Sequence, residues 1–266
     1  MSRIALAQTT TTDDLKANLE AAEAMVRDAA AGGADLLAFP EVFLYIGGRK
    51  GKLEVAEFLE GPLVGRFREA AARLGMMILL GSLHERIADN PDRIYNTSVL
   101  IDRQGQVLAH YRKLHMFDID LPNLVMKESD TVQPGPVLPP VVQTDIGRVG
   151  LSICFDLRFS ELYRHLRTQG AEVIFIPANF TATTGAAHWE VLLRARAVET
   201  QTWVAAPAQW GPHNPRFRSF GHSALIDPWG EVKALKPEGA GLVFGEIDLE
   251  LVKKVRRELP MGVPEV

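Results

Sequence analysis

The chain has 266 residues, 47% of them hydrophobic and 23% charged, which is typical of a globular protein with a sizeable core. Its 29 basic and 33 acidic side chains give a formal net charge of −4, which argues against nucleic acid or an anionic membrane as a partner. One cysteine excludes an intrachain disulfide, and no apolar run approaches the roughly 18 residues of a membrane helix, so we expect a cytoplasmic protein with small-molecule partners.

The first half of the chain is predicted to alternate buried strands with helices. Its first helix has a polar cap at Thr12 or Asp13 and a stop at Gly32-Gly33. A turn at Arg103-Gln104-Gly105 closes this half with a hairpin. The expected elements are a strand from Arg3 to Gln8, a helix from Asp13 to Ala31, a strand from Leu36 to Phe39, a helix from about Leu63 to Leu74 and a strand from Met76 to Leu80.

A connector from Tyr111 to Thr144 follows the hairpin. It is rich in proline and glycine, including Pro134-Gly135-Pro136, so we expect it to be irregular and to run over the surface. Loops of this length within a compact domain are usually functional. Candidate functional residues are therefore expected in the connector.

The second half repeats the first in diverged form. The segment Gly33 to Phe43 is matched by Gly170 to Phe180, and Ser98 to Val107 is matched by Ser223 to Val232. The expected elements are a strand from Arg148 to Ile153, a short helix after Cys154, a strand from Val173 to Ile176, a helix from about Ala186 to Gln201, a strand from Thr202 to Ala206 and a hairpin turning at Asp227-Pro228-Trp229-Gly230.

Two βαβαββ halves of this kind each leave one apolar sheet face uncovered by their own helices. Each half can bury that face against the other, so we expect an α/β fold built as a four-layer α-β-β-α sandwich. Residues 1–266 then form a single domain. Asp248 is expected to cap a last helix that ends at Leu259, and prolines keep the tail of about 260–266 non-helical.

Cys154 is the strongest candidate for a reactive group. It stands where the apolar strand ends and a helix begins, a position at which α/β proteins bind ligands and backbone N–H groups favour a thiolate. The alternative is that Cys154 is a small apolar filler of the core, as free cysteines often are. The position of Cys154 in the sequence therefore predicts a nucleophile, and the structure around it tests this prediction.

Glu41 and Lys113 are candidate partners for this cysteine. Glu41 ends a buried strand of the other half, and its poorly solvated carboxylate would suit a general base for a thiol. Lys113 follows the first hairpin and could favour the thiolate and then stabilise an oxyanion. The alternatives are a glutamate that braces a loop and a lysine that is a solvated surface charge.

Three other kinds of site are weighed against this one. His115 could replace Lys113 as the partner of the cysteine, as in papain-like hydrolases, and Glu128 could be an exposed loop acid. The seven histidines are scattered without a HExxH pattern, so no catalytic metal is expected. Neither glycine pair continues into a phosphate or dinucleotide loop, so no cofactor is expected.

Three segments together resemble the signatures of the nitrilase superfamily, the carbon-nitrogen hydrolases, and the resemblance runs from about Arg3 to Pro260. The segments are Phe39-Pro40-Glu41, Tyr111-Arg112-Lys113-Leu114-His115 and Ile153-Cys154-Phe155-Asp156-Leu157-Arg158-Phe159. The resemblance implies the four-layer fold and a Glu41-Lys113-Cys154 triad, with Glu128 as an additional structural or catalytic glutamate.

Further segments, among them Thr184 to Glu190 and Gly221-His222-Ser223, are similar to the Nit branch of amidases. This resemblance implies hydrolysis of a small linear carboxylate-bearing amide to acid and ammonia, with deaminated glutathione as the substrate. The alternatives are 2-oxoglutaramate or 2-oxosuccinamate, and then a nitrile or another aliphatic or carbamoyl amide. Nitrilases usually have Trp-Glu after the cysteine, so Phe155-Asp156 favours amides, although the Nit branch commonly has tyrosine at Phe155.

Four residues are candidates for substrate binding. Arg158 follows Cys154 by four residues and can hold a carboxylate with two parallel hydrogen bonds, although it could instead pair with Glu161. Phe180 and Thr184 lie after the second buried strand and are candidates for the pocket wall. Phe155 follows the nucleophile, and its backbone N–H could bind the oxyanion together with Lys113.

The expected mechanism proceeds through a thioester. Glu41 takes the thiol proton, protonates the leaving amine and then activates water, while Glu128 orients Lys113. A non-catalytic interaction protein on the same fold is the alternative of a different class, but it would have had no need of all three triad residues. The resemblance also implies a homodimer or a higher homo-oligomer.

Overall fold

The computed structural model describes residues 1–121, 124–215 and 217–262. It contains two six-stranded sheets that lie face to face. The first sheet runs, edge to edge, through β16 (Gly241–Ile247), β1 (Ser2–Gln8), β2 (Leu36–Ala38), β3 (Met77–Arg86), β4 (Ile94–Ile101) and β5 (Val107–Arg112). The second runs through β15 (Val232–Lys236), β14 (Ser223–Ile226), β11 (Trp203–Ala206), β10 (Val173–Phe175), β9 (Gly147–Leu151) and β8 (Val141–Thr144).

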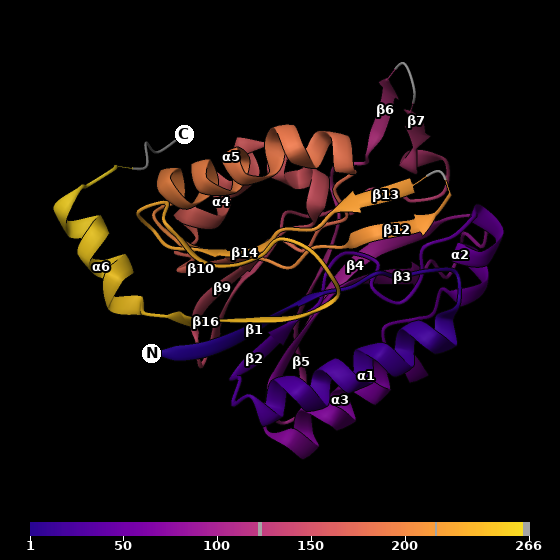
Figure 1. Cartoon of the computed structure of the whole chain (residues 1–266), viewed down its shortest axis with the longest axis horizontal. Helices are drawn as coiled ribbons and strands as arrows, with labels where there is room; N and C mark the ends of the chain where they lie inside the picture. Colours follow the sequence, from indigo (N-terminus) through magenta and orange to yellow (C-terminus); the bar gives the residue numbers. More distant parts are fainter. Residues whose placement is uncertain (122–123, 216, 263–266) are drawn as a thin grey trace.

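The predicted four-layer sandwich is confirmed (Figure 1). Two helices, α1 (Leu15–Ala31) and α3 (Pro62–Leu74), cover the outer face of the first sheet. On the opposite side of the molecule, α4 (Ser160–Thr168) and α5 (Ala182–Thr200) cover the second. The fold therefore has helices outside and two sheets inside.

The two halves have the same strand order, as the internal repeat predicts. In each, three parallel strands, β1-β2-β3 or β9-β10-β11, are followed by two antiparallel strands, β4-β5 or β14-β15. Each sheet also gains an antiparallel edge strand that the repeat did not indicate, β16 beside β1 and β8 beside β9. Glu41 follows β2, the second parallel strand of its half, and Cys154 follows β9, the first parallel strand of the other half, so both residues lie at the carboxyl ends of parallel strands.

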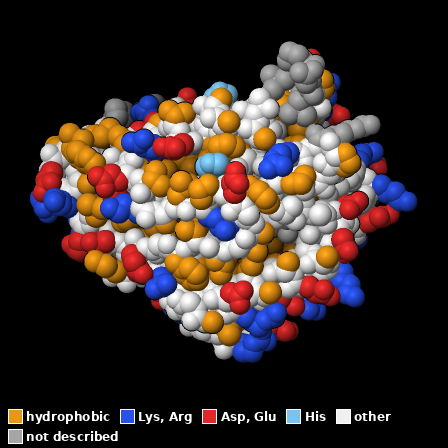
Figure 2. Space-filling model, in the orientation of Figure 1, with side chains coloured by type: hydrophobic (Ala, Val, Ile, Leu, Met, Phe, Trp, Pro, Cys, Tyr) orange, Lys and Arg blue, Asp and Glu red, His pale blue; other side chains and the backbone are white. Residues whose placement is uncertain are grey.

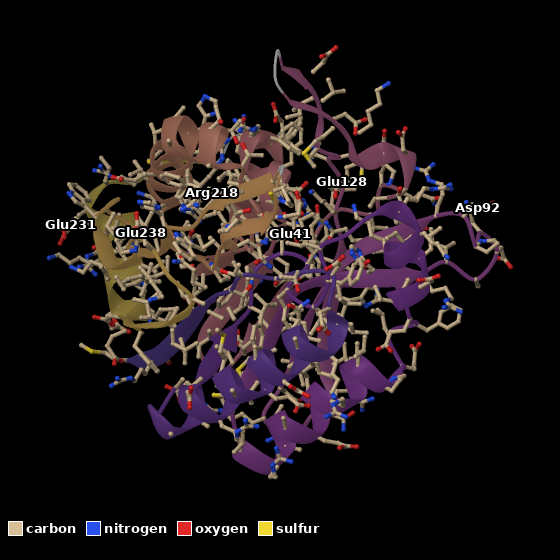
Figure 3. The ribbon with its side chains drawn as sticks, turned by 45° about the vertical axis from the view of Figure 1, so that its right-hand side comes forward. Glu41, Asp92, Glu128, Arg218, Glu231 and Glu238 are labelled. Atoms are coloured by element: carbon tan, nitrogen blue, oxygen red, sulfur yellow. The ribbon has the colours of Figure 1, made fainter. Side chains whose placement is uncertain are left out.

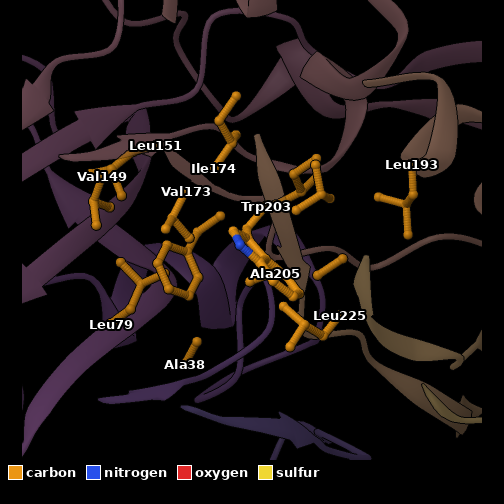
Figure 4. Packing of buried hydrophobic residues seen from close by; sticks show 14 of the residues in the cluster. Ala38, Leu79, Val149, Leu151, Val173, Ile174, Leu193, Trp203, Ala205 and Leu225 are labelled. Atoms are coloured by element: carbon orange, nitrogen blue, oxygen red, sulfur yellow. The ribbon is translucent and has the colours of Figure 1, made fainter. Parts of the chain in front are cut away.

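The core follows from the alternation of side chains along the strands. In β1, Ile4 and Leu6 pack between the sheets, whereas Ala5 and Ala7 pack under the helices. Residues from both sheets meet in the central layer, among them Leu79 of the first sheet and Trp203 of the second (Figure 4). Because this layer is buried between the two sheets, its packing fixes the position of one half relative to the other.

Several predicted boundaries differ from the structure. Helix α1 begins after Asp14, not Asp13, because the Asp14 carboxylate accepts the N–H of Ala17. Helix α5 begins at Ala182, four residues before the predicted start, because Thr181 caps it through the N–H of Thr184.

The prediction of an irregular connector is wrong for much of its length. It contains a hairpin of β6 (Asp118–Leu121) and β7 (Leu124–Lys127), a 3-10 turn at Glu128–Asp130 and the edge strand β8. Sequence analysis also missed α2 (Arg49–Val55) and a second hairpin of β12 (Trp210–Asn214) and β13 (Phe217–Phe220). All of these lie outside the two six-stranded sheets, except β8.

The last helix, α6 (Leu249–Glu258), is capped as predicted, because Asp248 accepts the N–H of Glu250. The chain is non-helical from Leu259 to Gly262, and the rest of the predicted tail lies outside the described residues. Among the described helices, none combines the length and the apolar character needed to traverse a lipid bilayer.

Candidate active site

Cys154 lies on a sharp turn between β9 and a short 3-10 helix, Cys154–Arg158. Its φ of 46° is in the left-handed region, which costs a residue with a β-carbon about 1–2 kcal/mol. The turn is held because the Cys154 N–H donates to the carbonyl of Pro177 at 2.9 Å. A strained turn of this kind projects a side chain from the sheet edge, as the turn that carries the nucleophile does in α/β-hydrolases.

The side chain of Asp156 stabilises the same turn. The buried carboxylate accepts hydrogen bonds from the Tyr111 hydroxyl at 2.8 Å and from the Ile153 N–H at 2.9 Å. It also accepts the backbone N–H of His115, whose ring Nδ1 lies 2.7 Å from the same carboxylate. Asp156 therefore ties the nucleophile turn to the chain around Lys113.

Lys113 joins two carboxylates in the centre of the molecule. Its Nζ donates to Glu41 Oε1 at 2.8 Å and to Glu128 Oε2 at 2.8 Å. Only 1% of Lys113 and 4% of Glu41 are exposed, so these charges have little water to screen them. Figure 3 shows Glu41 in the middle of the molecule, with Glu128 on the side of the β6-β7 hairpin. The structure thus brings together four residues that lie far apart in the sequence, including Cys154.

Asn96 completes this cluster from β4. Its side-chain amide donates to Glu41 at 2.9 Å and to Glu128 at 3.2 Å. The backbone N–H of Phe117 donates to Glu128 at 2.7 Å. These bonds hold both carboxylates in place independently of Lys113.

The charges of the cluster set the protonation state of each group. Burial alone would lower the pKa of Lys113, but Glu128 and Glu41 raise it well above its usual value, so the ammonium stays charged. Although burial opposes it, the charge of Lys113 lowers the pKa of Glu128. Both groups are therefore ionised at neutral pH.

The thiol of Cys154 behaves in the opposite way. Burial and the neighbouring charge of Glu41 raise its pKa well above its usual value, and Lys113 offsets only part of this shift. The sequence predicts that the helix start and Lys113 favour a thiolate, but burial and the charge of Glu41 outweigh Lys113 and favour the thiol. It is hydrogen-bonded to Glu41, so that carboxylate is positioned to take its proton.

Cys154 opens onto two spaces. One is a cavity of about 910 Å³ that contains the side chains of Glu41, Lys113 and Glu128. The other is a recess of only about 10 Å³, which is lined by Phe117, Phe155, Arg158, Asn179, Phe180 and Thr184. The four predicted substrate-binding residues therefore line one recess at the nucleophile.

Arg158 lies on the wall of this recess. Its guanidinium lies 5.6 Å from the ring centre of Phe155 and 5.2 Å from that of Phe180. It contacts His188 at 3.2 Å, and the described residues show no ion pair with Glu161, the alternative partner. The positive charge of Arg158 is therefore held, half-buried, between two rings at the recess.

The alternative base, His115, has a structural position. Its ring stacks on Phe159 with 3.6 Å between ring centres, and it is bound to Asp156. It lines neither of the two spaces onto which Cys154 opens. Within the described part of the chain, no three His, Cys, Asp or Glu side chains form a group that could hold a metal ion.

Three residues around Cys154 were not predicted as members of the site: Asn96, Asp156 and Asn179. Asn96 had a signal, since it begins a run of three polar residues, Asn96-Thr97-Ser98, between the apolar ends of a strand. Asp156 was read only as part of a signature, and Asn179 contributes a backbone hydrogen bond that lowers the pKa of Cys154. A backbone contact of that kind has no trace in the residue type.

Comparison with known proteins gives a consistent result. The family model described as carbon-nitrogen hydrolase matches residues 3–257. The chain is 42% identical over 262 residues to deaminated glutathione amidase of Homo sapiens, covering 97% of this chain and 80% of that protein. It is 43% identical over 255 residues to deaminated glutathione amidase of Synechocystis sp., covering 95% and 94%.

Comparison with solved structures finds similar folds in related proteins. The NitFhit protein of C. elegans superposes with a TM-score of 0.92 at 39% identity, covering 97% of this chain and 63% of that longer one. Nit3 of Saccharomyces cerevisiae, a member of branch 10 of the nitrilase superfamily, gives 0.88 at 27% identity, covering 98% and 94%. A Glu-to-Gln mutant of an amidase from Nesterenkonia sp. AN1, with acrylamide added at its active-site cysteine, gives 0.81 at 26% identity, covering 97% and 98%.

Proposed function

The chain belongs to the carbon-nitrogen hydrolase family, as the sequence resemblance predicts, and from that premise we propose that it hydrolyses the amide bond of deaminated glutathione at Cys154. The observation that carries the proposal is the cluster at the nucleophile. There a thiol contacts the Glu41 carboxylate, and that carboxylate shares the Lys113 ammonium with Glu128. The arrangement suits acyl transfer to sulfur.

In the first half-reaction, Glu41 removes the thiol proton as the sulfur of Cys154 attacks the amide carbonyl carbon. The carbonyl oxygen becomes an oxyanion, which the remaining N–H of the Lys113 ammonium and the backbone N–H of Phe155 stabilise. Phe155 stands in the first turn of its 3-10 helix, where the N–H groups have no acceptor within the helix. When the carbon–nitrogen bond breaks, Glu41 returns the proton to the leaving amine, and a thioester remains.

In the second half-reaction, Glu41 takes a proton from water, and the hydroxide attacks the thioester carbonyl. The carbon–sulfur bond breaks, the sulfur regains a proton, and the carboxylic acid leaves. The fixed position of Glu41 allows one carboxylate to serve both steps. Glu128 orients Lys113 throughout, and water and the substrate are the only other reactants in this proposal.

The substrate follows from the two spaces beside the sulfur. A 2-oxo acid that carries the amide on its side chain would place its carboxylate beside Arg158, in a recess of about 10 Å³ whose side chains must move apart to admit it. The amide nitrogen then points toward Glu41 and the large cavity. In deaminated glutathione this nitrogen belongs to cysteinylglycine, whereas in 2-oxoglutaramate it leaves as ammonia.

The proposal is tested by comparing kcat/KM for deaminated glutathione, 2-oxoglutaramate and 2-oxosuccinamate. We expect deaminated glutathione to have the highest value, since the large cavity has room for the dipeptide. Liquid chromatography of the released 2-oxo acid measures all three reactions in the same way. A higher value for either small amide would assign the protein to ω-amidase chemistry instead.

Arg158→Lys should raise KM for deaminated glutathione about tenfold and change kcat less. A lysine keeps the charge but loses the two parallel donors that match a carboxylate. Arg164→Lys, an exposed change in α4, is the control and should leave KM as it is. An unchanged KM in Arg158→Lys would show that the carboxylate binds elsewhere.

We also propose that the chain forms a homodimer. An apolar hollow of about 670 Å³ lies between α5 and the β14-β15 hairpin, a region where Figure 2 shows hydrophobic side chains gathered on the surface. Val191 is 62% exposed and Trp229 is 59% exposed, which is unusual for side chains of their size. A second copy covering this face would bury them.

Light scattering after gel filtration measures the mass. We expect twice the chain mass for the wild-type protein and a single chain mass for Trp229→Glu, because a buried carboxylate without a partner opposes association. A wild-type mass of 29.3 kDa, that of one chain, would contradict the proposal.

A further inference from the structure

The large cavity contains a cation that the proposed mechanism does not use. Lys52, on α2, lines this cavity together with the catalytic groups. Among the described residues no hydrogen bond or ion pair to its ammonium is found. Its electrostatic neighbours are Glu128 and Glu41, which attract it, and Lys113, which repels it. Because Glu41 and Glu128 are already bound to Lys113, the positive charge of Lys52 is available to bind an anionic ligand.

A second polar group lies on the same wall. His84, near the end of β3, is 6% exposed, and neither ring nitrogen has a partner within ordinary limits of hydrogen-bond distance and angle. A weak hydrogen bond with the backbone of Tyr45 opposes the lowering of its pKa. Buried polar groups that are so poorly satisfied are rare in proteins. Its ring lines the cavity beside Lys52, and the two groups are close enough to interact electrostatically.

These two groups suit an anionic ligand. Burial and the charge of Lys52 lower the pKa of His84 to about 3, so at neutral pH the ring is uncharged and carries one N–H donor. The ammonium of Lys52 supplies up to three more donors. Two other charged residues on the cavity wall, Asp13 and Lys127, are exposed to solvent, where their charges are screened.

We propose that Lys52 and His84 form a subsite for the carboxylate of the leaving group, the terminal carboxylate of cysteinylglycine in deaminated glutathione. The inference rests on the proposed function, which places the amide nitrogen beside Glu41. From that nitrogen an extended dipeptide reaches roughly 7 Å. Lys52 lines the same cavity as Glu41 and Glu128, so an extended dipeptide in that cavity can place its carboxylate beside the ammonium of Lys52.

The subsite makes Lys52 a specificity-determining residue. It contacts a part of the substrate that the small amides 2-oxoglutaramate and 2-oxosuccinamate lack. It should therefore favour substrates whose amine ends in a carboxylate over those that release ammonia. Lys52 is only half-buried, so a substitution there should leave the fold intact.

The test is the ratio of kcat/KM for deaminated glutathione to that for 2-oxoglutaramate. Lys52→Met should lower this ratio about 10- to 100-fold, the size expected for one desolvated charge pair. Lys52→Arg should restore most of it. Lys50→Met, an exposed change on the same helix where Lys50 pairs with Glu54, is the matched control and should not alter the ratio.

A substrate variant completes the cycle. Deaminated glutathione with its glycine carboxylate converted to an amide should lose the same factor in the wild-type protein and lose nothing further in Lys52→Met. Equal losses for both substrates in Lys52→Met would overturn the subsite and make Lys52 a counter-charge for Glu41 and Glu128. A wild-type protein inactive on deaminated glutathione would overturn the proposed function, and the subsite with it.

Discussion

Replacing Cys154 with alanine is expected to lower kcat by at least about 10⁴-fold, because it removes the atom that forms the thioester. The side chain is small and the turn at φ 46° is held by the backbone and by Asp156, so the cavity should keep its shape. Substrate binding, measured by calorimetry, should therefore persist. Product release by liquid chromatography measures the loss of activity.

Intact-mass measurement separates this mechanism from its alternatives. Wild-type protein mixed with a slow amide and quenched in acid should gain the mass of the acyl group, and Cys154→Ala should not. An acyl adduct that persists in Cys154→Ala would move the nucleophile to another residue. Wild-type protein without activity on any small amide would instead favour a non-catalytic interaction protein.

Replacing Lys113 with methionine should affect both activity and stability. Loss of an oxyanion donor costs about 10²- to 10³-fold in kcat. It also leaves the carboxylates of Glu41 and Glu128 facing each other without the buried cation between them. Removing one partner of a buried charge cluster lowers the free energy of unfolding by about 3 kcal/mol or more.

The dependence of this loss on pH gives a sharper test. In the wild-type protein the pKa of Glu128 is lowered, so its contribution to stability is present at neutral pH and is lost as the pH falls through that value. Without Lys113, like charge and burial favour the protonated form of one carboxyl, so acid should stabilise the variant. Urea unfolding at pH 5 and pH 8 should show the variant gaining stability at pH 5, whereas Glu128 contributes no such change to the wild-type protein, because its pKa is lowered below 4.5.

His115→Ala is the control for the competing mechanism. Because His115 is bound to Asp156 and lines neither space beside the sulfur, the variant should retain kcat within about tenfold. A papain-like enzyme would show the reverse pattern, with activity lost in His115→Ala and kept in Lys113→Met. The two variants therefore distinguish the two mechanisms.

Most of the architecture could be predicted from the sequence, because the patterns that indicate strands and helices are local and occur in both halves of the chain. Buried strands with side chains on alternating faces, such as β1, and glycine stops, such as Gly32, mark most of the two sheets. Helix α2 could not be found in this way, since none of its residues is fully buried and it contains Gly51. The hairpin of β6 and β7 had an alternating pattern, but the prolines around it outweighed that signal.

The candidate site was predictable in its members but not in its electrostatics. Three signature segments pointed to Glu41, Lys113 and Cys154, and the structure places their side chains together. The protonation state of Cys154 depends on the balance between burial and Glu41, which raise the pKa of the thiol, and Lys113, which lowers it. The sizes of these effects depend on distances that the sequence does not give. Lys52 escaped notice because it lies on a helix that was not predicted.

The pairing of β16 with β1 has a consequence for biosynthesis. The strand that completes the first sheet comes from the far end of the domain, seven paired positions beside Ser2–Gln8. During translation, β1 must wait with one edge open until almost all of the chain has emerged from the ribosome. Pairing of strands so far apart in the sequence slows folding, and until it forms, the unpaired edge of β1 can pair with other chains. Nascent chains of this protein should therefore depend on chaperones until β16 has been synthesised.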